Sequence, residues 1–238
     1  VYQLYELLTS RFPEILFESC ASGGARFDPG MMYYAPQCWT SDDTDALERL
    51  KIQYGTSMVY PVSSLGAHVS AAPNHQLLRN TPIETRANVA YFGTFGYELD
   101  LNKLNMDEQI KVKEQITFMK DYREIIQFGT FYRLKSPFEG NETVWMVVSQ
   151  DQNTAIIGYY RTLQEVNVGY RRVKLLGLDP DKEYHVNLNN TVHYGDELMN
   201  LGLITTDSSC GENKEKYDGT NGDYLSCLLY TSDAADDK

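Results

Sequence analysis

The pattern of apolar residues changes at Gly129, and this change restricts the fold more than any other feature of the sequence. Before Gly129, short apolar runs alternate with stretches of helical periodicity, which is typical of successive β-α units and a parallel sheet. After it come β-rich runs that are separated by turn residues, with no helical pattern between them. These runs are Val144–Ser149, Thr154–Tyr160, Tyr170–Leu176 and Glu183–Leu188. The sequence therefore predicts an α/β domain over residues 1–129 and an antiparallel sheet or sandwich over residues 130–226.

Within residues 1–129 we expect four short strands and, after an opening helix, three further helices. The strands are predicted at Ile15–Phe17, Gln37–Ser41, Ser57–Val62 and Thr94–Leu101. The helices are predicted at Thr44–Tyr54, from Thr81 to about Tyr91, and at Met106–Phe128. Asp45 and Glu48 are spaced as an N-cap and its N3 partner, and Thr81–Glu84 has the pattern of a capping box. Gly55 is expected to end the first helix.

No metal site, cofactor or disulfide framework is indicated. The cysteines show no C-x-x-C spacing, which favours reduced thiols of a cytoplasmic protein. They are Cys20, Cys38, Cys210 and Cys227. His68 and His75 fall in a predicted loop, Ser63–Asn80, and are not spaced to bind a metal. We expect both to be polar loop residues.

The net charge and the lack of long apolar runs exclude two classes of partner, and the first residues indicate how the chain begins. A formal net charge of -12 would repel a phosphate backbone, so nucleic acid is not an expected partner. No apolar run is long enough to cross a bilayer, so no membrane role is expected. The sequence starts at Val1, without Met, and directly in a helical pattern. We expect the start to be truncated.

Asp42 is the strongest candidate for a catalytic group because it follows a predicted strand and precedes a predicted helix. In a β/α barrel the substrate lies over the carboxyl ends of the strands. Asp43 and Asp45 compete with Asp42, and an acidic residue at a helix start also stabilises the helix dipole. Spacing alone favours helix capping over catalysis for Asp42.

Other candidates lie near Asp42 in the sequence. The loop Cys20–Arg26 is rich in glycine, which allows close approach of its backbone to a neighbour or a ligand. By itself Cys20 is more typical of a small buried hydrophobe than of a nucleophile. Arg26 can pair with Asp28, and Trp39 is more typical of strand packing than of a sugar platform.

Two motifs resemble glycoside hydrolase family 36. The loop Cys20–Arg26 matches the C-x-x-G-x-x-R motif of that family, and Trp39–Gly55 is similar to its acid/base segment. Further similar stretches reach to about Ser226. The resemblance implies that Asp42 is the general acid/base of a retaining alpha-galactosidase, and that Cys20 and Gly23 line the galactose pocket. We also expect substrate contacts from Arg26 and Trp39.

The resemblance also implies a fold and a missing part. Residues 1–129 would form the second half of a (β/α)8 TIM barrel, and residues 130–226 a carboxyl-terminal antiparallel β-sandwich. The family's nucleophile is the aspartate of a Lys-Trp-Asp stretch, which this sequence lacks. We therefore expect the chain to be inactive alone. Residues 227–238 resemble translated adapter sequence, and we expect this non-native tail to pack against nothing.

The expected substrates are terminal alpha-galactosides of the melibiose and raffinose type. The expected assembly is a homo-oligomer, a tetramer by family resemblance. A related alpha-N-acetylgalactosaminidase or galactosyl transferase is an alternative with the same chemistry. An alternative of another class is a noncatalytic carbohydrate-binding module, which the missing nucleophile permits.

Overall fold

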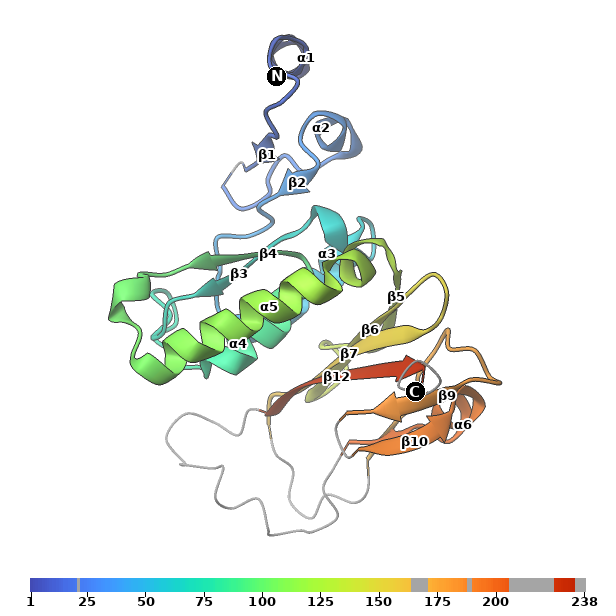
Figure 1. Cartoon of the computed structure of the whole chain (residues 1–238). Coiled ribbons are helices and arrows are strands. Elements are labelled where there is room, and N and C mark those ends of the chain that lie inside the picture. The colour runs from blue at the N-terminus through green and yellow to red at the C-terminus, as the bar shows by residue number, and fades with distance from the viewer. Residues whose placement is uncertain (21, 164–170, 188–189, 206–224, 234–238) are drawn as a thin grey trace. The chain divides into compact units, whose positions relative to one another are not determined.

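The chain divides into two compact units, Val1–Met119 and Lys120–Lys238. A computed structural model describes residues 1–20, 22–163, 171–187, 190–205 and 225–233 (Figure 1). Three positions that carried predictions, Tyr170, Leu188 and Cys210, lie outside the described residues. The division between the units falls inside the long helix α5, Met106–Phe128.

Strands and helices alternate in the first unit. Its elements are α1 (Tyr2–Arg11), β1 (Glu18–Ser19), α2 (Pro29–Tyr34), β2 (Gln37–Cys38), α3 (Ala46–Ser57), η1 (Val62–Ser64), β3 (Gly66–Ser70), α4 (Ile83–Ala90), β4 (Thr94–Glu98), η2 (Leu101–Lys103) and the start of α5. β1 pairs with β2 and β3 with β4, in parallel in both cases. A parallel bridge between Cys38 and Leu65 links the two ladders. This succession agrees with the predicted β-α units.

The third predicted strand, Ser57–Val62, is wrong. Ser57 ends α3, and the strand lies further along the chain at Gly66–Ser70. Met58 and Val59, which suggested a strand, are exposed, whereas Ala67 and Val69 are fully buried. The segment that forms the strand is therefore the one that is buried between neighbouring elements. Strand propensity alone does not include this burial. His68 therefore lies on β3 and not in a loop, whereas His75 is an exposed loop residue as expected.

Several predicted ends also shift. β1 begins at Glu18, after the expected run Ile15–Phe17, whose first two residues are exposed. β2 ends at Cys38 rather than Ser41, and β4 ends at Glu98 rather than Leu101. α3 continues past Gly55 to Ser57, and the hydroxyls of Thr56 and Ser57 bond to carbonyls of the preceding turn.

The starts of α4 and α5 are capped differently. Pro82 is the N-cap of α4 and no side chain caps this end, so the predicted Thr81–Glu84 capping box is wrong. The carbonyl of Thr81 accepts a hydrogen bond from Arg86 Nε instead. At α5 the side chains of Asn105 and Glu108 each accept a hydrogen bond from the other's backbone amide. This reciprocal cap explains why the predicted start of α5 is confirmed.

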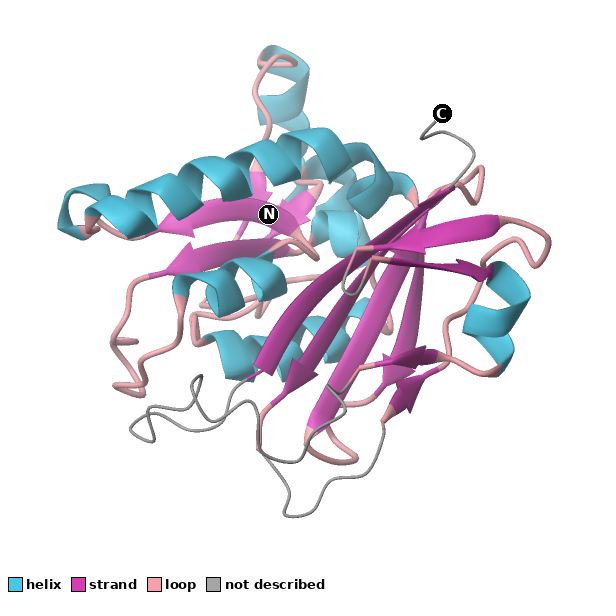
Figure 2. Cartoon of the chain, turned by 60° about the horizontal axis from the view of Figure 1, so that its bottom comes forward, coloured by secondary structure: helices cyan, strands magenta, loops and turns pink. Residues whose placement is uncertain are grey.

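The second unit contains a six-stranded antiparallel sheet in the order β10-β9-β12-β7-β6-β5, which Figure 2 shows in magenta. Its strands are β5 (Thr130–Lys135), β6 (Glu142–Val148), β7 (Thr154–Arg161), β9 (Glu183–Val186), β10 (Thr191–Tyr194) and β12 (Leu225–Asp233). β8 (Arg172–Val173) pairs separately with β11 (Leu203–Ile204). The antiparallel prediction is confirmed, whereas α6 (Gly195–Asn200) was not predicted.

The core of the second unit forms on alternate residues of its central strands. Val144, Met146 and Val148 of β6 pack with Ile157 and Tyr159 of β7 in one buried cluster. The same cluster includes residues of β8, β9, α6 and β11. The small ladder and α6 therefore contribute to one core with the large sheet, which gives a layered β unit.

The last strand corrects one prediction. β12 pairs with β7 along Leu225–Ser232 and with β9 along Thr231–Asp233. Residues 227–233 therefore take a central place in the sheet, which contradicts the prediction that this segment packs against nothing. The non-native origin of residues 227–238 is a separate matter and stays a prediction.

Candidate functional site

Asp42 lies in the loop between β2 and α3, and its side chain is exposed. Its Oδ1 accepts a hydrogen bond from Trp39 Nε1 at 3.2 Å. This contact orients one carboxylate oxygen towards the indole. Asp42 thus presents an oriented carboxylate beyond the carboxyl end of a parallel strand.

The two neighbouring carboxylates hold the backbone of this loop. Asp45 is the N-cap of α3, as predicted, and its Oδ1 accepts from the amides of Leu47 and Glu48 at 3.0 and 3.2 Å. Asp45 also pairs with Arg79 and is only 1% exposed. Asp43 Oδ1 accepts from the amide of Asp45 at 3.0 Å. Helix capping, which spacing favoured for Asp42, belongs to Asp45.

Arg49 of α3 reaches back beneath the loop, although its sequence position gave no hint of this. Its Nη2 donates to the carbonyl of Ser41 at 2.7 Å, and its Nη1 donates to Thr40 Oγ1 at 3.2 Å and to the carbonyl of Gly66 at 3.4 Å. Burial lowers the pKa of Arg49 to about 10, and Asp43, Glu98 and Asp42 oppose that shift. The guanidinium remains positively charged at neutral pH.

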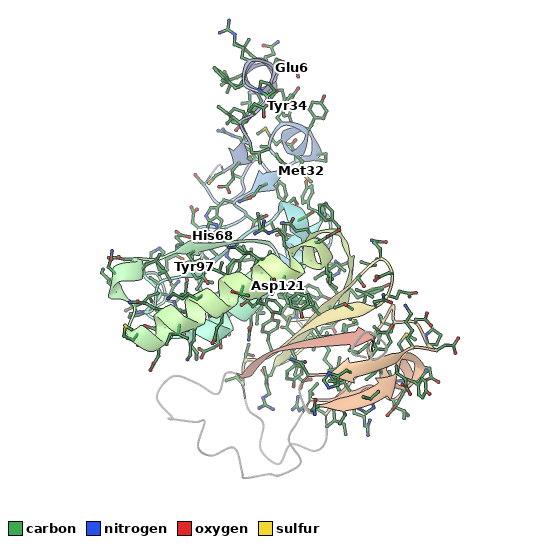
Figure 3. The ribbon with its side chains drawn as sticks, viewed as in Figure 1. Glu6, Met32, Tyr34, His68, Tyr97 and Asp121 are labelled. Carbon is green, nitrogen blue, oxygen red and sulfur yellow. The ribbon has the colours of Figure 1, made fainter. Side chains whose placement is uncertain are left out.

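Trp39 packs among polar and charged groups. The Arg49 guanidinium lies 4.3 Å from the centroid of its ring, and the His68 ring is stacked at 4.6 Å. His68 Nδ1 lies 3.4 Å from Glu98 Oε2, and Figure 3 labels His68 on the first unit. A Cβ at Gly66 would come within 2.9 Å of the Trp39 ring, so the absence of a side chain there leaves room for the indole.

The glycine-rich loop lies against the backbone that carries Asp42. Gly23 has a φ of +68°, and a Cβ there would lie 2.8 Å from the Asp42 amide nitrogen. Gly24 has a φ of +92°, and a Cβ there would lie 2.9 Å from the Thr40 carbonyl oxygen. Both glycines are therefore required by close approach as well as by backbone conformation. The two sequence motifs meet at Gly23 and Asp42.

The remaining predicted site residues are accessible. Cys20 and Arg26 are exposed, and Trp39 is partly buried. Cys20 is thus not the buried hydrophobe that its residue type suggested. Asp28 does not pair with Arg26 but caps α2, accepting from the Met31 amide at 2.9 Å and from the Tyr2 hydroxyl at 2.7 Å.

The comparisons with known proteins identify the family. The family model named Melibiase matches residues 1–129, and the model named Glycosyl hydrolase family 36 C-terminal domain matches residues 142–230. The chain belongs to glycoside hydrolase family 36. Alpha-galactosidase AgaA of Geobacillus stearothermophilus is 56% identical over 203 residues, which is 85% of this chain and 28% of that relative. Alpha-galactosidase Mel36A of Lactobacillus acidophilus is 49% identical, again over 28% of its length.

Solved family 36 structures have the same fold over nearly the whole chain. The alpha-galactosidase AgaB of Geobacillus stearothermophilus matches 98% of this chain with a TM-score of 0.89 and 50% identity, over 30% of its own length. A variant of AgaA in complex with raffinose matches 98% of this chain with a TM-score of 0.89 and 49% identity. The chain thus spans less than a third of the family 36 proteins that it resembles.

The part of the chain that the structure describes contains neither a metal-binding cluster nor a membrane-spanning helix. Among the described residues, no group of three or more His, Cys, Asp or Glu side chains could hold a metal ion. No helix in the same part of the chain is long and apolar enough to span a membrane.

Proposed function

We propose that this chain supplies the acid/base half of the active site of a retaining alpha-galactosidase, and that Asp42 is the acid/base. One observation carries the proposal: among three adjacent carboxylates, Asp43 and Asp45 hold backbone amides, whereas Asp42 is exposed and oriented by Trp39. An exposed carboxylate at the carboxyl end of a β/α strand is suitably placed to meet a substrate.

In this mechanism Asp42 acts twice. In the first step it donates a proton to the glycosidic oxygen as the bond to the anomeric carbon breaks and a second carboxylate attacks that carbon. In the second step Asp42, now ionised, removes a proton from the water that hydrolyses the covalent intermediate. The chain needs no metal or cofactor for these two proton transfers.

The second carboxylate comes from outside these 238 residues in our proposal. The sequence contains no Lys-Trp-Asp stretch, and retaining enzymes place their two carboxyl groups about 5 to 5.5 Å apart. We propose that the first unit is the second half of a (β/α)8 barrel and that residues 130–226 form the carboxyl-terminal β domain. In the described residues, β1 and β4 each have a strand partner on one side only.

Exposed apolar side chains support this incomplete barrel. Leu16, next to β1, is 87% exposed, and Leu4 and Leu7 of α1 are exposed as well. α1 has no buried residue at all. Apolar surface of this kind is normally covered in a soluble protein, and the rest of a barrel would cover it.

The pocket of the complete enzyme is proposed to take terminal alpha-galactosyl groups of melibiose and raffinose-type sugars. Cys20, Gly23, Arg26 and Trp39 are the proposed contacts from this chain. We further propose a cytoplasmic homotetramer, with Cys20 and Cys38 as free thiols. Sedimentation of the complete enzyme tests the tetramer.

The experiment on the function uses the complete enzyme. Asp42→Ala should reduce hydrolysis of melibiose by about 10² to 10⁴-fold, which is the usual contribution of a general acid/base. Hydrolysis of a nitrophenyl galactoside should fall less in its first step, because that leaving group needs no proton. Asp43→Asn is the matched control, since it keeps the Oδ1 acceptor for Asp45 and should leave both rates close to wild type. Wild-type hydrolysis of melibiose by Asp42→Ala would exclude the proposal.

Two further assays separate the alternatives. Rates on an alpha-galactoside and on its N-acetyl analogue, measured with the complete enzyme, distinguish a galactosidase from an N-acetylgalactosaminidase. Melibiose hydrolysis by the isolated 238-residue chain should be absent. Genuine turnover by that chain would contradict the proposal that its nucleophile lies elsewhere.

A further inference from the structure

We infer that Arg49 is a positioning residue for Asp42, which it holds through the Ser41 carbonyl and through the ring of Trp39. This inference rests on the proposed role of Asp42 as acid/base. It goes beyond that role because Arg49 touches neither the carboxylate nor, in our proposal, the sugar.

The first contact fixes the backbone. Arg49 Nη2 donates to the carbonyl oxygen of Ser41 at 2.7 Å, and Ser41 directly precedes Asp42. The peptide plane between these two residues includes this carbonyl, so the bond restricts the direction in which the Asp42 side chain leaves the backbone. Nη1 adds bonds to Thr40 Oγ1 and the Gly66 carbonyl, which tie the loop to β3.

The second contact fixes the side chain. The guanidinium lies 4.3 Å from the centroid of the Trp39 ring, and the indole Nε1 donates to Asp42 Oδ1 at 3.2 Å. Because the carbonyl oxygen of a protonated carboxyl is the better acceptor, this bond favours Oδ1 as carbonyl and Oδ2 as the oxygen that carries the proton. Arg49 and Trp39 together would then aim the donated proton.

The arrangement requires an arginine. A planar guanidinium can donate to several carbonyls and stack on an aromatic ring at the same time, whereas a lysine ammonium cannot stack in this way. Arg49 is only 3% exposed, so water does not replace these contacts easily. A lysine at this position would keep the positive charge but could not make the same set of hydrogen bonds and the stacking contact with Trp39.

Arg86 provides a matched control in the same unit. It is 5% exposed, and its guanidinium donates to the carbonyls of Thr81 and Ser70. Burial lowers its pKa as it does for Arg49. Arg86→Lys thus imposes a similar loss of buried hydrogen bonds, but the carbonyls that Arg86 bonds belong to Thr81 and Ser70 and not to the residues that flank Asp42.

The test measures kcat and KM of the complete enzyme on melibiose and on a dinitrophenyl galactoside. Arg49→Lys should lower kcat on melibiose by about ten- to a hundredfold, the cost of misplacing a catalytic group by about 1 Å. Its KM for melibiose and its first-step rate on the activated substrate should stay within about threefold. Arg86→Lys should change the rates on the two substrates by equal factors.

Trp39→Phe is a second variant in case Arg49→Lys fails to fold, because phenylalanine keeps an aromatic ring at this position but has no N–H group to donate to Asp42. It should show the same selective loss on melibiose. Equal losses on both substrates for Arg49→Lys and Trp39→Phe, or a change in KM alone, would overturn the inference. If Asp42→Ala itself hydrolyses melibiose at the wild-type rate, the proposed function fails instead.

Discussion

The indole Nε1 of Trp39 donates a hydrogen bond to Oδ1 of Asp42 over 3.2 Å. These residues are three apart in the sequence, at the point where the chain leaves β2 and turns towards α3. Through this bond Trp39 orients the carboxylate of Asp42. The substrate contact proposed for Trp39 is a separate role.

Gly23→Ala should disrupt the site. The new methyl group would lie 2.8 Å from the Asp42 amide nitrogen, and the backbone φ of +68° is strained for alanine. We expect a loss of about 1 to 2 kcal/mol in unfolding free energy. Chemical denaturation of the chain measures this, and the complete enzyme should lose activity as well.

Gly55→Ala is the control for Gly23→Ala. Gly55 lies inside α3, and nothing lies within 4 Å of a Cβ built there. Alanine should therefore stabilise the chain by about 0.5 to 1 kcal/mol. An equal effect of the two substitutions would contradict the close approach of Gly23 to the Asp42 backbone.

Asp45→Ala should destabilise the first unit. The substitution removes the acceptor for two amides at the start of α3 and leaves Arg79 without its carboxylate partner. We expect a loss of about 2 kcal/mol or more in unfolding free energy. Glu48→Ala, which removes an exposed pair with Lys51, should change it by less than about 0.5 kcal/mol. Urea unfolding of both variants gives the comparison.

Cys20 should react with iodoacetamide much faster than Cys38 in the folded chain. Cys20 is exposed, whereas Cys38 is fully buried and burial raises its pKa to about 11. The reactive thiolate is therefore scarce at Cys38 and shielded from the reagent. Mass spectrometry of tryptic peptides resolves the two sites. In the complete enzyme galactose should slow the labelling of Cys20, and unchanged labelling would argue against a contact between Cys20 and the sugar.

Glu142 should make the second unit less stable in acid. Burial alone would raise its pKa, but hydrogen bonds from Lys135, Tyr159 and Arg171 outweigh burial and lower it to about 2. Since the folded pKa lies below the unfolded one, the stabilisation is complete above about pH 5 and is lost as the pH falls towards 2. The loss should be about 3 kcal/mol. Glu142→Gln should flatten this part of the curve of unfolding free energy against pH.

Local signals predicted those elements whose determinants are close together in the sequence. Asp45 was predicted to cap α3 because the cap depends on the next three residues, and α5 was predicted because its apolar residues recur at helical spacing. The change of pattern at Gly129 is also a local signal, and it correctly predicted parallel pairing before this residue and antiparallel pairing after it. The motifs around Cys20 and Asp42 placed the chain in its family before its fold was known.

Contacts between distant residues decided the rest. β3 could not be recognised because its strand is selected by burial of Ala67 and Val69, while the more strand-like Met58 and Val59 are exposed. The same holds for β12, whose pairing with β7 and β9 depends on strands far back in the chain.

The sequence by itself determined the family, the alternation of elements and the presence of three carboxylates at the start of α3. Only the tertiary structure distinguished the roles of these carboxylates. Asp45 caps α3, Trp39 orients Asp42, and Arg49 bonds to the Ser41 carbonyl, and each of these contacts depends on distances in the folded chain. A carboxylate is the same acceptor in each place, and the donors that reach it decide what it does.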